Sequence, residues 1–274
     1  RTGSAMASRT AAYGRAAFAW AIKRGALHTN PFANLPIAAS IKARDRVLRD
    51  EEVAEIWRAA SETSFPYGTI VRLLMLTGQR KSEVAGMTWA EIADDLATWS
   101  IPGGRTKNGV PHVVPLSGAA RDLIGSLLSK HADEPRSTIE DRRAQGALVL
   151  PGILGTPFGG WSKSKAALDA AILKTRAEAA TKLGRKPALL VPWRLHDLRR
   201  TLATGLQRLG VRLEVTEATL NHVSGSRAGI VGVYQRHDWA TEKRAALDAW
   251  AAHVLVAVKG PASAGNVVTL ARAV

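Results

Sequence analysis

A histidine and an arginine are spaced in this sequence so that both could act on one bound group. His196 and Arg199 stand three positions apart in the segment LHDLRRTLATGLQRLG, so a helix would project both side chains from the same strip. Arginine presents a planar fork to phosphate oxygens, and histidine can donate or move a proton, so together they suit an anion. Taken alone, the spacing is more typical of a solvated surface pair in a basic helix.

Three charged residues earlier in the chain could belong to the same site. Arg80 is expected at the start of a helix, where backbone amides favour an anion, and Glu83 could hold it by a salt bridge. Such a pair is also an ordinary helix-start interaction of small energy. Lys107 is expected beside a hairpin turn, where a lysine is usually a solvated edge charge but could also reach into a DNA groove and protonate a leaving group.

A second histidine and a tyrosine follow toward the C-terminus. His222 in ATLNHVSGS is expected at the end of a short helix, where a histidine is more often a cap or half-buried residue than a catalyst. Tyr234 in VGVYQRHD comes twelve residues later and is one of only three tyrosines. With a pKa of about 10, a tyrosine is a poor nucleophile unless cations stabilise its phenolate or a base takes its proton. The sequence offers several cations in this region.

These side chains need a scaffold, and the sequence predicts a mainly α fold with a small antiparallel β-sheet (α+β). Helices are expected over 7–28, after an N-cap at Asp50, on both sides of a break at Gly78, over 118–131 and through most of 162–259. Short strands are expected at TWSIP, GRTK, PHVVPL and ALVLP, with Asn108 and Gly109 forming a tight hairpin turn beside Lys107. The helix that carries His196 should bury the face formed by Leu195, Leu198, Leu202, Leu206 and Leu209.

The composition narrows the possible functions. There are 38 Lys and Arg residues against 23 acids, a formal net charge of +15 that is spread along the chain and predicts a polyanionic partner. The absence of cysteine excludes disulfides, thiolate catalysis and cysteine-ligated metal. We see neither a His-Glu-x-x-His cluster nor a phosphate-binding loop, and expect no metal or cofactor. No apolar run is long enough to span a membrane, so we expect a soluble, cytoplasmic protein.

Two segments are predicted. Prolines in TNPFANLP end the first helix, and the basic stretch IAASIKARDRV resembles a linker. The boundary is therefore expected near residue 47, with a main domain over 48–274. The first residues are typical of the interior of a helix, so we expect this sequence to be a fragment of a longer protein.

The order of five motifs resembles the tyrosine recombinase, or phage integrase, family: LTGQRKSEV, RTKNGVPHVVPLS, LHDLRRTLAT, LNHVSG and VYQRHD. The resemblance covers roughly residues 48 to 258 and is specific as an ordered set. It implies the catalytic-domain fold of the family over 48–274, with a C-terminal helix and tail. It also implies that residues 1–47 are the C-terminal part of a core-binding domain and its linker.

The resemblance assigns roles residue by residue. It implies that Arg80 is the first catalytic arginine, that Lys107 is the hairpin lysine, and that His196 and Arg199 form the His-x-x-Arg box. His222 matches a position that holds His or Trp in the family, and Tyr234 matches the nucleophile. Asn221 stands where many members carry glycine, and the spacing from His222 to Tyr234 is longer than in many.

The implied reaction needs no high-energy cofactor. Tyr234 would attack a DNA phosphodiester, forming a 3′-phosphotyrosyl bond and releasing a 5′-hydroxyl that Lys107 protonates. Arg80, Arg199 and His222 would hold the non-bridging oxygens, and His196 would act as a general base or an orienting donor. The implied partners are double-stranded DNA attachment sites, further copies of the chain in a DNA-dependent homotetramer, and accessory DNA-bending or excision proteins.

The leading interpretation is a site-specific DNA recombinase of a prophage or other mobile element, in the bacterial cytoplasm. One alternative is a type IB topoisomerase-like enzyme, which shares the tyrosyl intermediate. The other is a basic helical DNA-binding protein without catalysis, in which the same residues contact only the DNA backbone. Net charge does not separate these interpretations.

Overall fold

The computed structural model describes residues 2–35, 45–129, 139–222 and 238–260 of the chain. It divides into two compact units, Arg1–Asp45 and Arg46–Val274. The described helices of both units include none that is long and apolar enough to cross a membrane.

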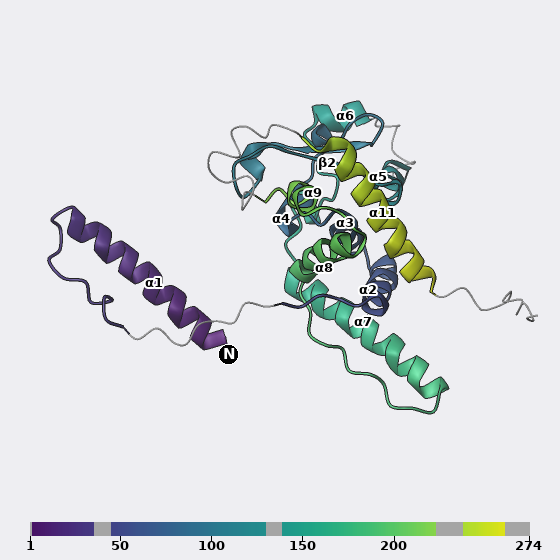
Figure 1. The fold of residues 1–274 in the computed structure, drawn as a ribbon, viewed down its shortest axis with the longest axis horizontal. Helices are drawn as coiled ribbons and strands as arrows, with labels where there is room; N and C mark the ends of the chain where they lie inside the picture. Colours follow the sequence, from purple (N-terminus) through teal and green to yellow (C-terminus); the bar gives the residue numbers. More distant parts are fainter. Residues whose placement is uncertain (1, 36–44, 130–138, 223–237, 261–274) are drawn as a thin grey trace, which may run out of the picture. The chain divides into compact units, whose positions relative to one another are not determined.

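The first unit is one helix with a segment that folds back along it (Figure 1). Helix α1 spans Thr2–Lys23. The Arg15 guanidinium donates to the carbonyl oxygens of Phe32 at 2.9 Å and Leu35 at 2.6 Å. The Phe18 and Phe32 rings lie 5.3 Å apart between centroids. These contacts are local to the unit and hold the returning segment on α1.

The described part of the second unit is mainly helical with one two-stranded antiparallel sheet, which confirms the predicted fold class. Its described elements in chain order are α2 (Asp50–Glu62), α3 (Tyr67–Thr77), α4 (Lys81–Ala85), η1 (Trp89–Glu91), β1 (Thr98–Ile101), η2 (Gly103–Arg105), β2 (His112–Pro115), α5 (Gly118–Ser129), α6 (Ile139–Ala144), η3 (Ile153–Gly155), α7 (Trp161–Lys182), α8 (Leu195–Arg208), α9 (Leu213–Thr219) and α11 (Ala240–Lys259).

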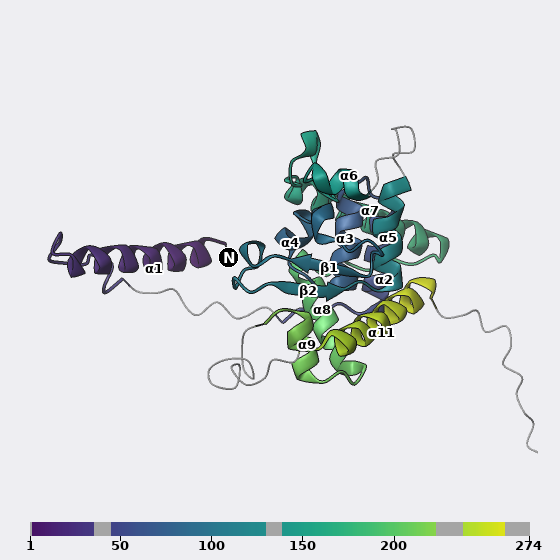
Figure 2. The ribbon, with the colours of Figure 1, turned by 90° about the horizontal axis from the view of Figure 1, so that it is seen from above.

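Helix α3 is the centre of the core. It is buried on nearly all sides, as expected for a helix that is apolar all round, and it contacts α2, α5, α8 and α11 (Figure 2). The α8 residues Leu198, Leu202 and Leu206 are buried, as the leucine spacing predicts. At the ends of that face, Leu195 is only partly buried and Leu209 is exposed. The Trp250 indole of α11 crosses this core and donates to the Met75 carbonyl oxygen at 2.8 Å.

The sheet is smaller than the sequence predicts. Strand β1 pairs with β2 in the register Trp99 with Val114 and Ile101 with His112. The prediction of a strand at GRTK is wrong, because these residues form η2 and the turn after it. Arg105 is drawn inward instead, where its guanidinium donates to the Glu83 carbonyl oxygen at 2.9 Å and pairs with Glu91 at 2.7 Å. The connection between the strands is therefore a long loop over 102–111, not a two-residue turn.

Two other local predictions need correction. Among the described residues, the ALVLP segment forms only isolated bridges, Thr88 with Leu148 and Pro151 with Pro157. Both residues of the second bridge are prolines, which have no backbone N–H to extend a ladder. Helix α2 has Arg49, not Asp50, as its N-cap, and the Glu52 carboxylate accepts from the Arg49 backbone amide at 2.9 Å. The helix therefore starts one residue earlier than expected.

A glycine in α8 tests the packing of α8 against α11. We predict that Gly205→Ala lowers the free energy of unfolding by about 1–3 kcal/mol, because overpacking outweighs the higher helix propensity of alanine, which is about 1 kcal/mol. The added Cβ would lie 2.2 Å from Cζ3 and 2.7 Å from Cε3 of the buried Trp250 ring. Chemical denaturation followed by circular dichroism measures the change.

The matched control is Gly125→Ala in α5. There the added Cβ would meet only a Leu96 methyl, at 3.4 Å. This variant should be as stable as the parent or more so, by up to about 1 kcal/mol. Equal effects of the two substitutions would contradict the packing argument.

Candidate functional site

Arg80 is positioned by the sharp corner between α3 and α4. Gly78 ends α3 with φ of 65°, a left-handed conformation that favours glycine. The Arg80 backbone amide then donates to Glu83 Oε2 at 2.8 Å, and its guanidinium Nη1 donates to Glu83 Oε1 at 2.9 Å. Because only 2% of the Glu83 side chain is exposed, this carboxylate is a buried anchor. The salt bridge predicted between the two side chains is therefore present.

His196 and Arg199 project from the first turns of α8. The Asp197 carboxylate accepts from the Arg194 backbone amide at 2.8 Å and so caps the helix. His196 is exposed, whereas only 5% of Arg199 is. One strip of the helix thus carries an accessible imidazole and, one turn later, a buried guanidinium.

The Arg199 guanidinium is held by the ends of two other helices. Its Nη1 donates to the Gly78 carbonyl oxygen at 2.8 Å and its Nη2 to the Leu220 carbonyl oxygen. Gly78 is the C-cap of α3 and Leu220 the C-cap of α9, and the C-terminal ends of helices carry partial negative charge. Burial and the nearby Arg80 cation lower the pKa of Arg199 to about 10, while Glu83 opposes the shift. Arg199 therefore stays charged at neutral pH.

Four of the predicted residues line one cavity of about 630 Å³, namely Arg80, Lys107, His196 and Arg199. Lys107 reaches it from the exposed loop between β1 and β2, far in sequence from α8. The other lining residues are Leu74, Gln79, Lys81, Ser82, Trp161, Ser162, Lys165, Trp193, Arg194 and Leu195. Of all fourteen described lining residues, six are Lys or Arg and none is Asp or Glu, so the cavity is suited to a phosphate.

Two tryptophans at this cavity escape sequence reasoning. The Lys81 ammonium lies 4.6 Å from the centroid of the Trp161 ring, and that of Lys165 lies 4.0 Å from the Trp193 ring. Such cation–π contacts restrain long lysine side chains. No periodic signal in the sequence joins either tryptophan to its lysine, because Lys81 and Trp161 belong to different helices and Trp193 lies in the irregular segment before α8.

His222 lies directly after α9, within the field of the same cations. Its backbone amide donates to the Glu217 carbonyl oxygen at 3.0 Å. Desolvation first, and then repulsion from Arg199, Arg80 and His196, lowers the pKa of His222 to about 4. Desolvation and the cations Arg199 and Arg200 also lower the pKa of His196. Both effects favour neutral imidazoles, each with one N–H donor and one acceptor nitrogen.

The carbonyl groups just before His222 are held by residues that sequence reasoning missed. The Thr219 carbonyl oxygen accepts from Gln79 Nε2 at 2.9 Å and from His112 Nε2 at 3.0 Å. Burial, followed by the Lys243 cation, lowers the pKa of His112 to about 4, so its neutral Nε2–H tautomer makes this bond. A histidine in an alternating strand gives no sequence signal for such a role.

Tyr234 lies outside the described residues. Within the described part of the chain, no group of three or more His, Cys, Asp or Glu residues could hold a metal ion.

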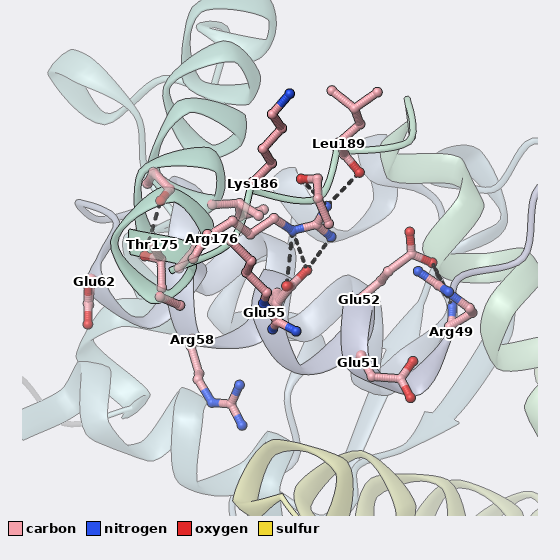
Figure 3. A pocket seen from close by; sticks show the side chains of 17 residues that line it. Arg49, Glu51, Glu52, Glu55, Arg58, Glu62, Thr175, Arg176, Lys186 and Leu189 are labelled. Atoms are coloured by element: carbon pink, nitrogen blue, oxygen red, sulfur yellow. Dashed lines mark hydrogen bonds and ion pairs between the residues drawn. The ribbon is translucent and has the colours of Figure 1, made fainter. Parts of the chain in front are cut away.

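A second cavity, of about 580 Å³, lies between α2 and α7 and has a different character (Figure 3). Its lining mixes basic residues with four glutamates, Glu51, Glu52, Glu55 and Glu62. The Arg176 guanidinium donates to Glu55 at 3.0 and 2.6 Å (Figure 3). The ion pair neutralises the charge of Arg176, and the glutamates offset most of the other positive charge. This cavity therefore lacks the excess of basic residues that lines the cavity around Arg80 and Arg199.

This chain is similar to several known proteins. Residues 46–239 match the family model described as the phage integrase family. Prophage integrase IntZ of Escherichia coli (strain K12) is 28% identical over 241 residues, which cover 85% of this chain and 52% of the relative. Tyrosine recombinase XerC of Erythrobacter litoralis (strain HTCC2594) is 23% identical, over 82% of this chain and 67% of the relative. The chain thus spans about half the length of the first of these relatives.

Solved structures share the fold. A lambda integrase tetramer bound to a Holliday junction matches with a TM-score of 0.55 and 19% identity, over 84% of this chain and 62% of that one. A lambda integrase dimer bound to a COC′ core site matches with a TM-score of 0.51 and 20% identity, over 86% of this chain and 60% of that one.

The buried His112 imidazole makes a pH-dependent contribution to stability. Its pKa is about 4 in the folded chain against 6.5 for a free imidazole, so the unfolded chain binds more protons between these values. Stability therefore falls as the pH is lowered from 6.5 toward 4, and His222 acts in the same direction. We predict that His112→Gln, which keeps an N–H donor but does not titrate, flattens this dependence by up to about 1.4 kcal/mol per pH unit.

Unfolding free energies from denaturant titrations at a series of pH values measure this effect. Above pH 7.5 the two proteins should show parallel behaviour, because both side chains are then neutral in the folded and unfolded states. The same slope in both proteins between pH 4 and 6.5 would contradict the assignment.

Proposed function

Since the chain belongs to the phage integrase family, we propose that it is a site-specific tyrosine recombinase that cleaves and rejoins DNA, integrating or excising a prophage or other mobile element. The observation that carries the proposal is the cavity on which Arg80, Lys107, His196 and Arg199 converge. These residues come from three separate parts of the sequence, and a cationic cavity of this kind can stabilise the charge that develops in phosphoryl transfer.

In the proposed reaction the Tyr234 oxygen attacks the phosphorus of a phosphodiester. The bond from phosphorus to the 5′ oxygen breaks, and a 3′-phosphotyrosyl bond forms. Arg80 and Arg199 hold the non-bridging oxygens, whose charge is redistributed in the transition state. The carboxylate of Glu83 orients Arg80, and two helix ends orient Arg199, so little reorganisation is needed when the charge shifts.

The remaining groups handle protons and hydrogen bonds. Lys107, a cation on the exposed loop between the strands, protonates the leaving 5′ oxygen. A neutral His196 accepts the tyrosine proton or orients the phosphate, and a neutral His222 donates its N–H to a non-bridging oxygen. The 5′-hydroxyl of another strand then attacks the phosphotyrosine, and the same groups act in reverse. Since the bond energy is kept in the intermediate, no nucleotide cofactor is consumed.

The proposed partners follow from the charge and the family. Affinity for double-stranded DNA comes mainly from phosphate contacts and decreases with salt, as expected for a chain with a net charge of +15. The similar lambda integrase structures include a dimer on a core site and a tetramer on a Holliday junction. We infer a DNA-dependent homotetramer for this chain, with residues 1–47 as the end of a core-binding domain and 48–274 as the catalytic domain. Accessory DNA-bending or excision proteins belong to the same proposal.

The covalent intermediate provides the direct test. We use a suicide substrate that contains the attachment site and a nick, so that the short fragment bearing the new 5′-hydroxyl diffuses away after cleavage. On it the wild-type chain should accumulate a protein–DNA adduct that survives denaturing electrophoresis. Tyr234→Phe should bind the same DNA and form no adduct, because it lacks the attacking oxygen. Binding by the wild type without any adduct would favour the non-catalytic interpretation. Relaxation of supercoiled DNA with no exchange of strands would favour the topoisomerase interpretation.

The buried carboxylate behind Arg80 provides a graded test. Arg80→Ala should slow cleavage by about 10²–10³-fold, the usual effect of removing one donor to a transition-state oxygen. Glu83→Gln keeps an acceptor for the Arg80 backbone amide but loses the ion pair, and should slow cleavage by only about tenfold because the guanidinium is present but less well oriented.

Single-turnover cleavage rates at saturating protein measure both effects. Retained thermal stability of each variant is the control for folding. A Glu83→Gln variant as slow as Arg80→Ala would contradict a purely orienting role for Glu83.

A further inference from the structure

The loop that carries Lys107 is joined to the turn that carries His222 by two asparagine side chains. Asn108 Nδ2 donates to the Asn221 carbonyl oxygen at 3.1 Å and to its side-chain Oδ1 at 3.2 Å. In return, Asn221 Nδ2 donates to Asn108 Oδ1 at 3.3 Å and to the Val110 carbonyl oxygen at 3.2 Å. The two amides therefore pair reciprocally across 113 residues of sequence.

Both asparagines are constrained by their own surroundings. Asn221 has φ of 49°, a left-handed conformation that asparagine tolerates better than most residues, and is only 4% exposed. Asn108 Oδ1 also accepts from the Val110 backbone amide at 3.2 Å and so bends the loop. A glycine at position 221 would accept this backbone conformation equally well but could not form the amide pair.

Each asparagine adjoins a residue of the proposed reaction. Lys107 precedes Asn108 on an exposed loop and forms no ion pair with another described residue. His222 follows Asn221, whose two preceding residues are already held through their carbonyl groups by Gln79, His112 and Arg199. The turn after α9 is thus anchored in the core, and the amide pair transmits that anchoring to the loop.

We propose that Asn108 and Asn221 are positioning residues that form a clasp, and that this clasp holds the Lys107 ammonium where it can protonate the leaving 5′ oxygen. This inference rests on the proposed recombinase function. The clasp contacts no reacting atom, so we expect it to affect the reaction by fixing the position of the Lys107 ammonium group at the cavity.

A substrate with an altered leaving group separates this role from a general loosening of the site. With a bridging sulfur in place of the 5′ oxygen, tyrosine attack expels a thiolate, which leaves without a proton. Lys107→Ala should then be slow on the oxygen substrate and near the wild-type rate on the sulfur substrate. Asn108→Ala and Asn221→Gly should show the same pattern, with losses of about ten- to a hundredfold on oxygen alone.

The double variant and a control complete the kinetic test. Asn108→Ala leaves the bond from Asn221 Nδ2 to the Val110 carbonyl oxygen, and Asn221→Gly leaves the bond from Asn108 Nδ2 to the backbone carbonyl oxygen of residue 221. The double variant should therefore be slower than either single variant, but by less than the product of the two losses, because both changes remove the amide pair itself. The control is Val113→Ala, because Val113 lies on β2 outside the clasp and 45% of it is exposed. This variant should cleave both substrates at the wild-type rate. Equal losses on the oxygen and sulfur substrates, no loss at all, or a Lys107→Ala variant that stays slow on sulfur would each overturn the proposal.

Hydrogen exchange tests the clasp without any DNA. Asn221→Gly should speed amide exchange over 106–110, and Asn108→Ala should speed it over 220–222, whereas Val113→Ala should change neither. These segments are distant in sequence, and the bond from His112 to the Thr219 carbonyl oxygen is kept in every variant, so a change in the opposite segment reports the loss of the clasp. Unchanged exchange in the opposite segment would overturn the proposal. A wild-type chain that cleaves neither substrate would refute the proposed function instead, and the exchange result would still decide whether the clasp exists.

Discussion

The cavity depends on how a buried guanidinium is held. A cation that is 5% exposed is costly unless its donors are satisfied and its charge is compensated. Arg199 meets both conditions with the carbonyl groups of Gly78 and Leu220, which are the C-caps of α3 and α9. These groups need donors, and the helix dipoles give them partial negative charge. One side chain from α8 therefore ties together three helices whose ends surround the cavity.

The same arrangement sets the protonation of the neighbouring histidines. Arg199 and Arg80 both repel a proton from His222, and His112 experiences the same two cations in addition to Lys243. Among the charges of the described residues that act on Arg199, only that of Glu83, buried behind Arg80, opposes them. The site therefore keeps cations and neutral imidazoles together, which costs stability in the free chain and leaves a positive potential that an incoming phosphate would relieve.

Much of the fold follows from local signals. The break at Gly78, the buried leucines of α8 and the predominance of helix after residue 161 are visible in the sequence, because glycine and apolar periodicity act locally. The strand predicted at GRTK fails for a tertiary reason, since Arg105 turns inward to Glu91 and the Glu83 carbonyl group. Propensity does not register such a contact, whose partners are 14 and 22 residues away.

The sequence by itself determined which side chains could do chemistry and in what order they occur, through the spacing of His196 and Arg199 and the motifs that contain Arg80 and Lys107. The tertiary structure alone decided that these four residues line one cavity, that Arg199 is buried between helix ends, and that Gln79, His112 and Asn108 hold the turn before His222. The physical reason is that residue type and periodicity record what a segment can do locally. Burial, pKa shifts and hydrogen bonds between distant carbonyl and amide groups exist only once the helices have packed.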